Sequence, residues 1–339
     1  MKSHAIIPIF IPHKGCPHAC IFCNQNRITL NEKPVSASEA AGIIEKHLST
    51  LKGRNITIIE AAFYGGSFTG IPIEQQSEYL ETARFYKTRG MINRIRLSTR
   101  PDYISDEILS NLKSYGVDTI ELGVQSFDDE VLEKSNRGHN SAIVYENSRM
   151  IQDYGFELGL QLMAGLPGDT LEKDIFSANE LVKIKPSIAR LYPAIVLEGT
   201  ELHRMYLAGD YSPLTLKESI GIVVEMYKII SSAGIHVIRA GLKSPDSIKS
   251  GSNSHPAFRQ LVESEIAKDS LERQLNEALS NKFSFLPPAS VRFLSNEKSF
   301  QNLVGHGKSN KIYFSEKYPS LKFIYETDNT LADGQYIVK

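Results

Sequence analysis

The chain of 339 residues contains no tryptophan and only three cysteines, and its formal net charge is -1. A charge so close to zero gives no overall field that would gather nucleic acid or an anionic membrane. No apolar run reaches the roughly 20 residues that a membrane-spanning helix needs. The N-terminal segment is interrupted by Pro8 and Pro12 and lacks a small-residue cleavage site, so it is predicted to be a strand and not a signal peptide. These absences predict a cytoplasmic protein with reduced thiols.

All three cysteines lie together, in the segment IPHKGCPHACIFCNQN. Cys16, Cys20 and Cys23 are spaced so that one loop can turn around a small inorganic centre. A cluster of four irons needs four ligands, so three thiolates leave one iron open. A structural zinc site completed by His13 or His18 is an alternative, although such sites usually draw their ligands from two separated pairs. A redox-active disulfide fits poorly, because three thiols do not form an isolated C-x-x-C motif.

Short β-rich runs alternate with amphipathic helical runs from the N-terminus to about residue 242. Six or seven βα units in a row, with strands apolar enough to be buried on both faces, predict a parallel sheet that curls into a full or partial TIM-like barrel. Two capping boxes, Ser36 with Glu39 and Thr215 with Glu218, predict helix starts. The predicted strands are AIIPIFI, ITIIEAAFYGG, RIRLSTRP, DTIELGVQS, FELGLQLMAGLPG, IARLYPAIV and HVIRAGL.

The unusual residues follow the predicted strands, at the end of a barrel where active sites lie. The cysteine loop follows the first strand, YGGS ends the second, STRPD the third, GVQS the fourth and GLPGDT the fifth. This arrangement predicts one site that is built from several βα units.

The character of the sequence changes after residue 242. We therefore predict a barrel domain over residues 1–242 and a small α+β appendage over residues 243–339. The appendage is expected to contain an amphipathic helix in AFRQLVESEIAKDSLERQLNEALSNKF and short strands at SVRFLS, KIYFSE, LKFIYE and GQYIVK. The helix carries an apolar stripe that would pack the appendage onto the barrel. The stripe consists of Phe258, Leu261, Val262, Leu275 and Leu279.

The C-x3-C-x2-C spacing after a first strand, with Phe22 just before the third cysteine, resembles the radical S-adenosylmethionine (SAM) superfamily. Several ordered segments resemble the radical SAM half of the Elongator catalytic subunit and, more distantly, oxygen-independent coproporphyrinogen oxidase. These segments are YGGSFTGIP, STRPDYI, IELGVQSFDDEVLEKSNRGH, GLQLMAGLPGDT and ARLYPAIVLEGTELHRMYLAGDYSPLTLKE. The similarity covers about residues 5–242.

This resemblance implies a radical SAM enzyme in which Cys16, Cys20 and Cys23 ligate a 4Fe-4S cluster. SAM would bind the open iron, and an electron from the cluster would split it into methionine and a 5'-deoxyadenosyl radical that abstracts hydrogen from a carbon. The cofactors would carry the difficult step while the barrel positions and shields it.

The resemblance also implies contacts to SAM. Gly65, Gly66 and Ser67 match the segment whose backbone meets the SAM amino group, and glycines let a backbone approach a ligand closely. Gln125 and Arg137 match positions that touch the polar groups of SAM, and the planar fork of arginine suits a carboxylate. Taken alone, the glycines would be a plain strand-to-helix turn and Arg137 a solvated helix residue.

Two positions depart from the family pattern. Ser98 stands where relatives commonly carry an acidic residue that bonds the ribose, and Gln161 stands where the porphyrin-related enzyme has an aspartate. Both side chains can form hydrogen bonds, but neither supplies a charged acceptor.

Arg100 is an alternative contact from the same strand end as Ser98. Tyr192 and Glu198 could face the substrate, but a core tyrosine and a helix-start glutamate are the simpler interpretation.

The acetyltransferase domain of the Elongator subunit, and its basic N-terminal extension, have no counterpart in this sequence. Residues 243–339 carry 13 Lys or Arg against 11 Asp or Glu, which is too even a balance for a phosphate-binding face. His255 and His306 stand beside proline or glycine, which is typical of turns, and receive no role.

The resemblance favours modification of a nucleoside in tRNA or another RNA, with an electron donor of the flavodoxin or ferredoxin type as partner. A small-molecule substrate is one alternative. The other is a protein that keeps the cluster for structure or redox sensing without cleaving SAM.

Overall fold

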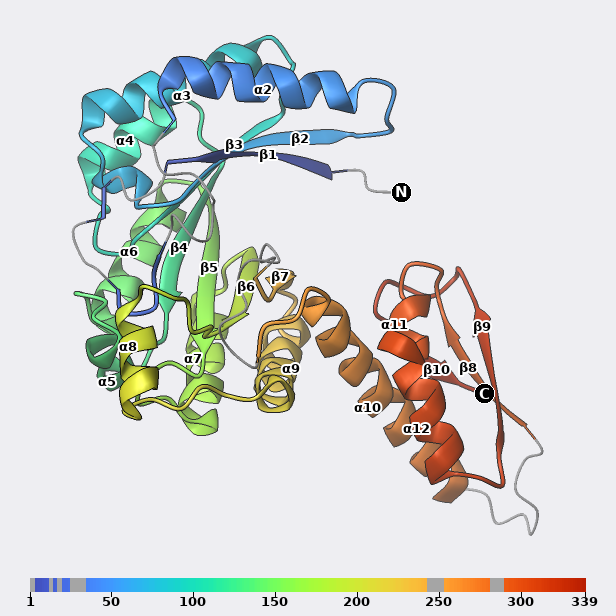
Figure 1. Cartoon of the computed structure of the whole chain (residues 1–339). Coiled ribbons are helices and arrows are strands. Elements are labelled where there is room, and N and C mark those ends of the chain that lie inside the picture. Colours follow the sequence, from blue (N-terminus) through green and yellow to red (C-terminus); the bar gives the residue numbers. More distant parts are fainter. Residues whose placement is uncertain (1–3, 12–14, 17–19, 25–34, 243–252, 281–289) are drawn as a thin grey trace.

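The computed structural model describes residues 4–11, 15–16, 20–24, 35–242, 253–280 and 290–339. Its main body is a seven-stranded parallel sheet whose strand order follows the sequence (Figure 1). The strands are β1 (His4–Phe10), β2 (Ile58–Tyr64), β3 (Arg94–Thr99), β4 (Thr119–Gln125), β5 (Glu157–Ala164), β6 (Ile188–Pro193) and β7 (His236–Ala240). The edge strands β1 and β7 do not pair with each other, so the predicted barrel is confirmed in its partial form.

Helices follow each strand and cover the outer face of the sheet (Figure 1). They are α2 (Ala37–Leu51), α3 (Ile73–Thr88), α4 (Asp106–Ser114), α5 (Asp129–Lys134), α6 (Ser141–Asp153), α7 (Leu171–Ile184), α8 (Glu201–Ala208) and α9 (Leu216–Ser232), with a short 3-10 turn η1 (Phe68–Gly70) after β2. Both predicted capping boxes are confirmed, at Ser36 with Glu39 and at Thr215 with Glu218. Within the described residues no helix is long and apolar enough to cross a membrane.

The two faces of the sheet differ in character. Ile95 and Leu97 of β3 belong to the main hydrophobic core. Side chains alternate between the faces of a strand, so Ser98, the residue after Leu97, points to the other face, where it lines a cavity together with Glu121 and Arg190. The prediction that the strands are apolar on both faces therefore holds for the helix-facing side, whereas the inner face mixes apolar side chains such as Phe10 and Met163 with charged and polar ones.

Helix α10 (Phe258–Ser280) connects the barrel to a three-stranded mixed sheet (Figure 1). The remaining elements are β8 (Ser290–Ser295), α11 (Phe300–Val304), η2 (His306–Lys308), α12 (Ser309–Lys317), β9 (Lys322–Thr327) and β10 (Ile337–Val338). The predicted apolar stripe splits between two cores, because Phe258 and Val262 join the barrel core while Leu275 joins a separate core under the small sheet. A small α+β unit after the barrel is thus confirmed, and its boundary at residue 242 stays a prediction.

One predicted strand is wrong. The segment KIYFSE lies in α12. Phe314 is fully buried in the appendage core while Ile312 is 50% exposed, although residues two apart in a strand would share a face. The helix instead lets Tyr313 donate a hydrogen bond of 2.8 Å to Glu272 of α10. Packing against α10 therefore overrides the β propensity of Ile, Tyr and Phe.

Candidate functional site

A cavity of about 440 Å³ lies on the inner side of the barrel, at the carboxyl ends of its strands. It brings together every predicted site residue except Ser67. Those in its lining are Cys16, Cys20, Cys23, Gly65, Gly66, Ser98, Arg100, Gln125, Arg137 and Gln161. Because these residues come from the loop after β1 and from β2 to β5 with their following loops, the fold assembles one site from segments that are far apart in the sequence.

Ser67 lies behind the cavity wall and is fully buried. Its hydroxyl lies 2.7 Å from Thr99 Oγ1 and accepts a hydrogen bond of 3.2 Å from the Arg100 N–H. Ser67 therefore joins the ends of β2 and β3, and a direct contact of its side chain with SAM stays a prediction.

The described part of the cysteine loop lies tightly against η1. A Cβ atom on Gly15 would stand 2.1 Å from the carbonyl oxygen of Ser67, and one on Gly70 would stand 2.1 Å from the carbonyl oxygen of Gly15. Gly15 also has a φ of +69°, which glycine adopts readily. This backbone-to-backbone contact places Cys16 beside the segment that follows β2.

Two guanidinium groups face the buried Cys20. Arg137 Nη1 lies 3.0 Å and Arg100 Nη1 lies 3.8 Å from its sulfur. Asp102 holds Arg100 through two hydrogen bonds of 2.9 and 2.8 Å. Burial raises the pKa of the Cys16 thiol, an effect that Arg100 and Arg137 oppose. Cations in these positions suit the negative charge of a thiolate-ligated cluster.

Arg137 keeps a donor that no described residue satisfies. Its Nη2 donates to the Gly123 carbonyl, whereas its Nε is buried and has no hydrogen-bond partner within the described residues. An unpaired buried donor is costly, and a carboxylate ligand would satisfy it. The donor set therefore fits the two groups that the family resemblance implies, a thiolate-bound cluster and the carboxylate of SAM.

Gln125 adopts an uncommon backbone conformation at the end of β4. Its φ is +79°, and it sits where the pairing register between β4 and β5 shifts. Such conformations persist only where the surrounding structure holds them in place, and they cluster at functional sites. Its side-chain oxygen accepts a hydrogen bond of 3.1 Å from Gln161 Nε2, so the two predicted polar contacts lie side by side.

Sequence reasoning missed a charged layer on the inner face of the barrel. Arg96 contacts Glu60 at 2.8 Å and also pairs with Glu121, which in turn pairs with Arg190 at 2.8 Å. All four side chains are buried. The sequence signal that could have revealed this layer is the presence of charged residues, Arg96, Glu121 and Arg190, inside the otherwise apolar strands RIRLST, TIELGVQ and IARLYP.

The structure also locates the residues that the sequence suggested less strongly, namely two substrate-facing candidates and two histidines. Tyr192 packs against a small hydrophobic cluster and also lines the cavity, whereas Glu198 is exposed and outside the lining. The rings of His255 and His306 lie 5.4 Å apart at the start of α10. Across the described ranges, no three His, Cys, Asp or Glu side chains converge as one metal ion would require. The zinc alternatives His13 and His18 lie outside the described residues.

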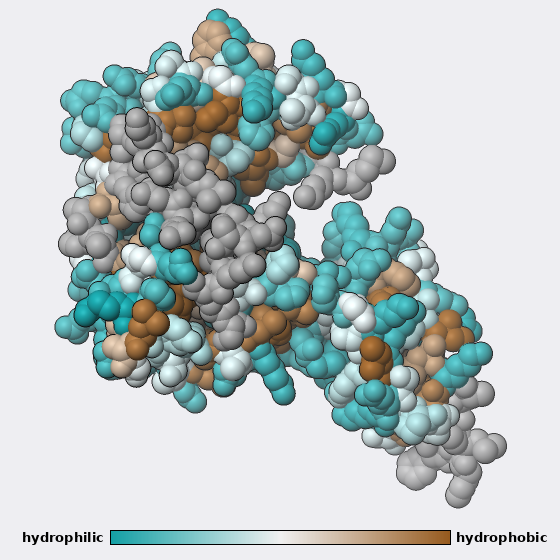
Figure 2. Space-filling model, in the orientation of Figure 1, coloured by the Kyte–Doolittle hydropathy of each residue, from teal (hydrophilic) through white to brown (hydrophobic). Residues whose placement is uncertain are grey.

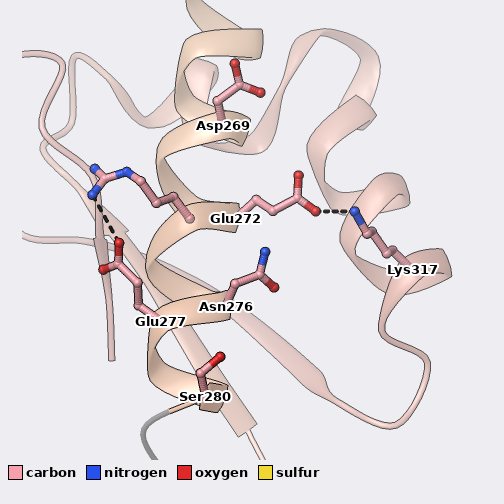
Figure 3. A pocket seen from close by; sticks show the side chains of 7 residues that line it. Asp269, Glu272, Asn276, Glu277, Ser280 and Lys317 are labelled. Atoms are coloured by element: carbon pink, nitrogen blue, oxygen red, sulfur yellow. Dashed lines mark hydrogen bonds and ion pairs between the residues drawn. The ribbon is translucent and has the colours of Figure 1, made fainter.

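A second pocket of about 760 Å³ lies between α10 and α12 (Figure 3). Its charged side chains already have partners, since Glu272 pairs with Lys317 and Arg273 pairs with Glu277 at 3.4 Å. Asp269 pairs with Lys228 of α9 at 2.8 Å. Figure 2 shows hydrophilic residues over most of the visible surface of this part of the molecule. The pocket therefore has the character of a solvated, charge-paired surface.

Comparison with known proteins agrees with this geometry. The model of the radical SAM superfamily matches residues 10–177, and that of the radical SAM C-terminal domain matches residues 186–268. A tRNA uridine(34) acetyltransferase of Methanocaldococcus jannaschii is 26% identical over 257 residues, which cover 65% of this chain and 48% of that protein. The chain thus spans about half the length of this relative.

Two solved structures share the fold. Elp3 of Methanocaldococcus infernus, which lacks its N-terminus in that structure, matches with a TM-score of 0.60 and 20% identity, over 80% of this chain and 64% of that one. Coproporphyrinogen III oxidase from Escherichia coli, a radical SAM enzyme, matches with a TM-score of 0.51 and 18% identity, over 69% of this chain and 53% of that one. The predicted resemblance is therefore confirmed. The chain belongs to the radical SAM superfamily of enzymes, which implies a 4Fe-4S cluster and SAM as its cofactors.

Proposed function

We propose that this enzyme cleaves SAM reductively and uses the resulting radical to modify a nucleoside of an RNA, most simply a tRNA. The observation that carries the proposal is the cavity that gathers the cysteines, Arg137 and Gln125 from separate βα units. When bound, a reduced 4Fe-4S cluster with SAM supplies a 5'-deoxyadenosyl radical, which abstracts a hydrogen atom from a carbon of the substrate.

The residues of the cavity divide into two groups by chemistry. Cys16, Cys20 and Cys23 would hold the cluster. Arg137, with its unsatisfied Nε, would bind the carboxylate of SAM, and the backbone of Gly65 and Gly66 would meet its amino group. Cys20 and Arg137 are buried in the barrel, and removal from water strengthens electrostatic contacts.

Three further residues form the rest of the proposed SAM surface. Ser98 and Gln161 line the cavity with neutral side chains that can bond ribose hydroxyls. Arg100 is a poorer candidate for the ribose, because its Nε and Nη2 bind Asp102 and its Nη1 faces Cys20. We assign Arg100 to the cluster side of the cavity.

An RNA substrate is supported by the relatives, one of which is named for uridine in tRNA. That protein is about twice as long as the region matched here, so acetyl transfer forms no part of the proposal. Radical SAM enzymes generally need a reductant, and we propose a donor of the flavodoxin or ferredoxin type in the cytoplasm.

A small-molecule substrate is the second candidate. The cavity volume of about 440 Å³ falls in the range of small-ligand sites. The net charge of -1 offers no general attraction for RNA. Both observations fit a small substrate, which would share the cavity with the cluster and SAM.

Anaerobic turnover tests the radical chemistry. Protein purified and reconstituted without air should hold four irons per chain and form 5'-deoxyadenosine when dithionite and SAM are added. Cys20→Ser should lose both properties. One zinc per chain without iron would support the zinc alternative, and a stable cluster without 5'-deoxyadenosine would support the sensor alternative.

A second assay separates the two substrate classes. Reduced enzyme and SAM are incubated with unmodified tRNA transcripts or with a metabolite extract, and the products are analysed by mass spectrometry. A new nucleoside in the tRNA digest is the expected result. A changed metabolite with unchanged tRNA would favour the small-molecule candidate and contradict the RNA proposal.

A further inference from the structure

Two tyrosines in the cavity wall share one arginine. Tyr64 ends β2 and Tyr192 lies in β6, and both line the cavity together with Arg190. Arg190 Nη2 donates to the Tyr64 hydroxyl at 2.9 Å, and Arg190 Nη1 donates to the Tyr192 hydroxyl at 3.4 Å. The predicted cluster and SAM contacts include neither tyrosine.

The direction of these hydrogen bonds determines whether each phenol can donate a hydrogen bond to a ligand. A guanidinium has only donors, so each phenol oxygen accepts from Arg190 and its own O–H is left to donate. Burial raises the pKa of Tyr64, which keeps this phenol protonated at neutral pH. Arg190 is itself held by Glu121, at 2.8 Å from Nε and 3.0 Å from Nη2. The wall therefore presents two oriented O–H donors.

The charges around these donors cancel. Arg96 and Arg190 are balanced by Glu60 and Glu121, with which they form ion pairs. Glu121 lies in the same cavity wall as the phenols, so an anionic ligand group would meet a carboxylate there. A neutral oxygen acceptor receives the two donors without that repulsion.

Aromatic rings complete the wall. Phe10 and Tyr64 both line the cavity, with ring centroids 6.0 Å apart. Flat aromatic faces are the surfaces on which nucleobases stack in single-stranded RNA recognition. An aromatic wall beside two O–H donors suits a planar ring that carries a carbonyl group.

We propose that Tyr64 and Tyr192, oriented by Arg190, form a donor pair that receives a neutral carbonyl oxygen of the substrate nucleobase. This inference rests on the proposed function, because it names the substrate group that the same cavity recognises. Arg190 acts as a positioning residue, and the phenols make the contact.

Uridine and its thio analogues test the donor pair. The reconstituted enzyme with SAM is dialysed against radiolabelled uridine, 2-thiouridine or 4-thiouridine, since sulfur is a weaker acceptor than oxygen. Wild type should bind at least one thio analogue about tenfold more weakly than uridine. Tyr64→Phe and Tyr192→Phe should bind uridine about tenfold more weakly and lose the preference for oxygen. Tyr206→Phe, at an exposed tyrosine of α8, should behave as wild type.

The outcomes of these assays distinguish a failure of the donor pair from a failure of the proposed function. A wild type that forms 5'-deoxyadenosine but binds no uridine, or Phe variants that keep the oxygen preference, would overturn the donor pair and leave the radical chemistry intact. Tighter binding of uridine 5'-monophosphate that both Phe variants lose would place an anion at the phenols and overturn the neutral carbonyl. A wild type that forms no 5'-deoxyadenosine would instead contradict the proposed function. Substitutions of Arg190 are avoided because they would leave Glu121 buried without its partner.

Discussion

Arg137 shows how a single side chain can connect the cluster loop to a bound ligand. One of its nitrogens faces Cys20, another donates to the Gly123 carbonyl, and its Nε has no partner in the described part of the chain. A planar group with donors on three nitrogens can serve three different acceptors, which an ammonium group cannot do in the same geometry. The position therefore requires arginine and not merely a positive charge.

Arg137→Lys should weaken SAM binding by about tenfold or more while it keeps the charge, because lysine lacks the planar fork. Equilibrium dialysis of radiolabelled SAM against the reconstituted protein measures this effect. The matched control is Arg149→Lys on α6, where the side chain is 85% exposed, and its affinity should equal that of wild type. Equal affinities for both variants would remove Arg137 from the SAM site.

Asp174 illustrates a buried carboxyl group that keeps its proton. It is 2% exposed at the start of α7, and burial next to Asp169 raises its pKa to about 9. Asp169 accepts hydrogen bonds from the N–H groups of Gly165 and Thr170. A protonated Asp174 can donate to Asp169, so the pair fixes the GLPGDT loop after β5.

Asp174→Asn should change the pH dependence of stability. The folded state holds a proton between the unfolded pKa of about 4 and the folded value of about 9, so wild-type stability falls as pH rises across this window. The variant cannot ionise, and relative to wild type it should gain at least about 1 kcal/mol between pH 5 and pH 8.

Urea unfolding at both pH values measures this gain. Asp153→Asn, at a side chain that is 71% exposed, is the control and should show no such gain. Parallel stability curves for Asp174→Asn and wild type would mean that the pair carries no extra proton.

At the scale of elements, local patterns predicted the barrel well, because each pattern has a local physical cause. The capping boxes at Ser36 and Thr215 satisfy backbone N–H groups within one turn. The segment KIYFSE failed because the contact of Tyr313 with Glu272 is not local. Likewise, Arg190 reaches Tyr64 across 126 positions in the sequence, and no local pattern could reveal that contact.

Gly70→Ala should disturb the cysteine loop through a single methyl group. The new Cβ would stand 2.1 Å from the carbonyl oxygen of Gly15, so the loop must move away from η1. We expect less than four irons per chain after reconstitution, with Gly42→Ala as the control because nothing lies within 4 Å of that position on α2. Full iron content in Gly70→Ala would show that the contact does not position the cysteines.

At the scale of the whole molecule, α10 is the element that joins two hydrophobic cores. Its first turns supply Phe258 and Val262 to the barrel core, and its later turns supply Leu271 and Leu275 to the core of the small sheet. Figure 1 shows the small sheet joined to the barrel through this helix. Damage to one core can therefore leave the other folded, because the described contacts between the two parts run mainly through α10.

Leu271→Ala should test this separation. Removal of a fully buried leucine costs about 2–5 kcal/mol in the core that contains it. Hydrogen exchange measured by mass spectrometry should accelerate in β8 and β9 but not in β3 to β6. Leu181→Ala in α7, whose side chain is fully buried in the barrel core, should give the reverse pattern. Faster exchange in both parts after either substitution would show instead that the two cores unfold as one cooperative unit.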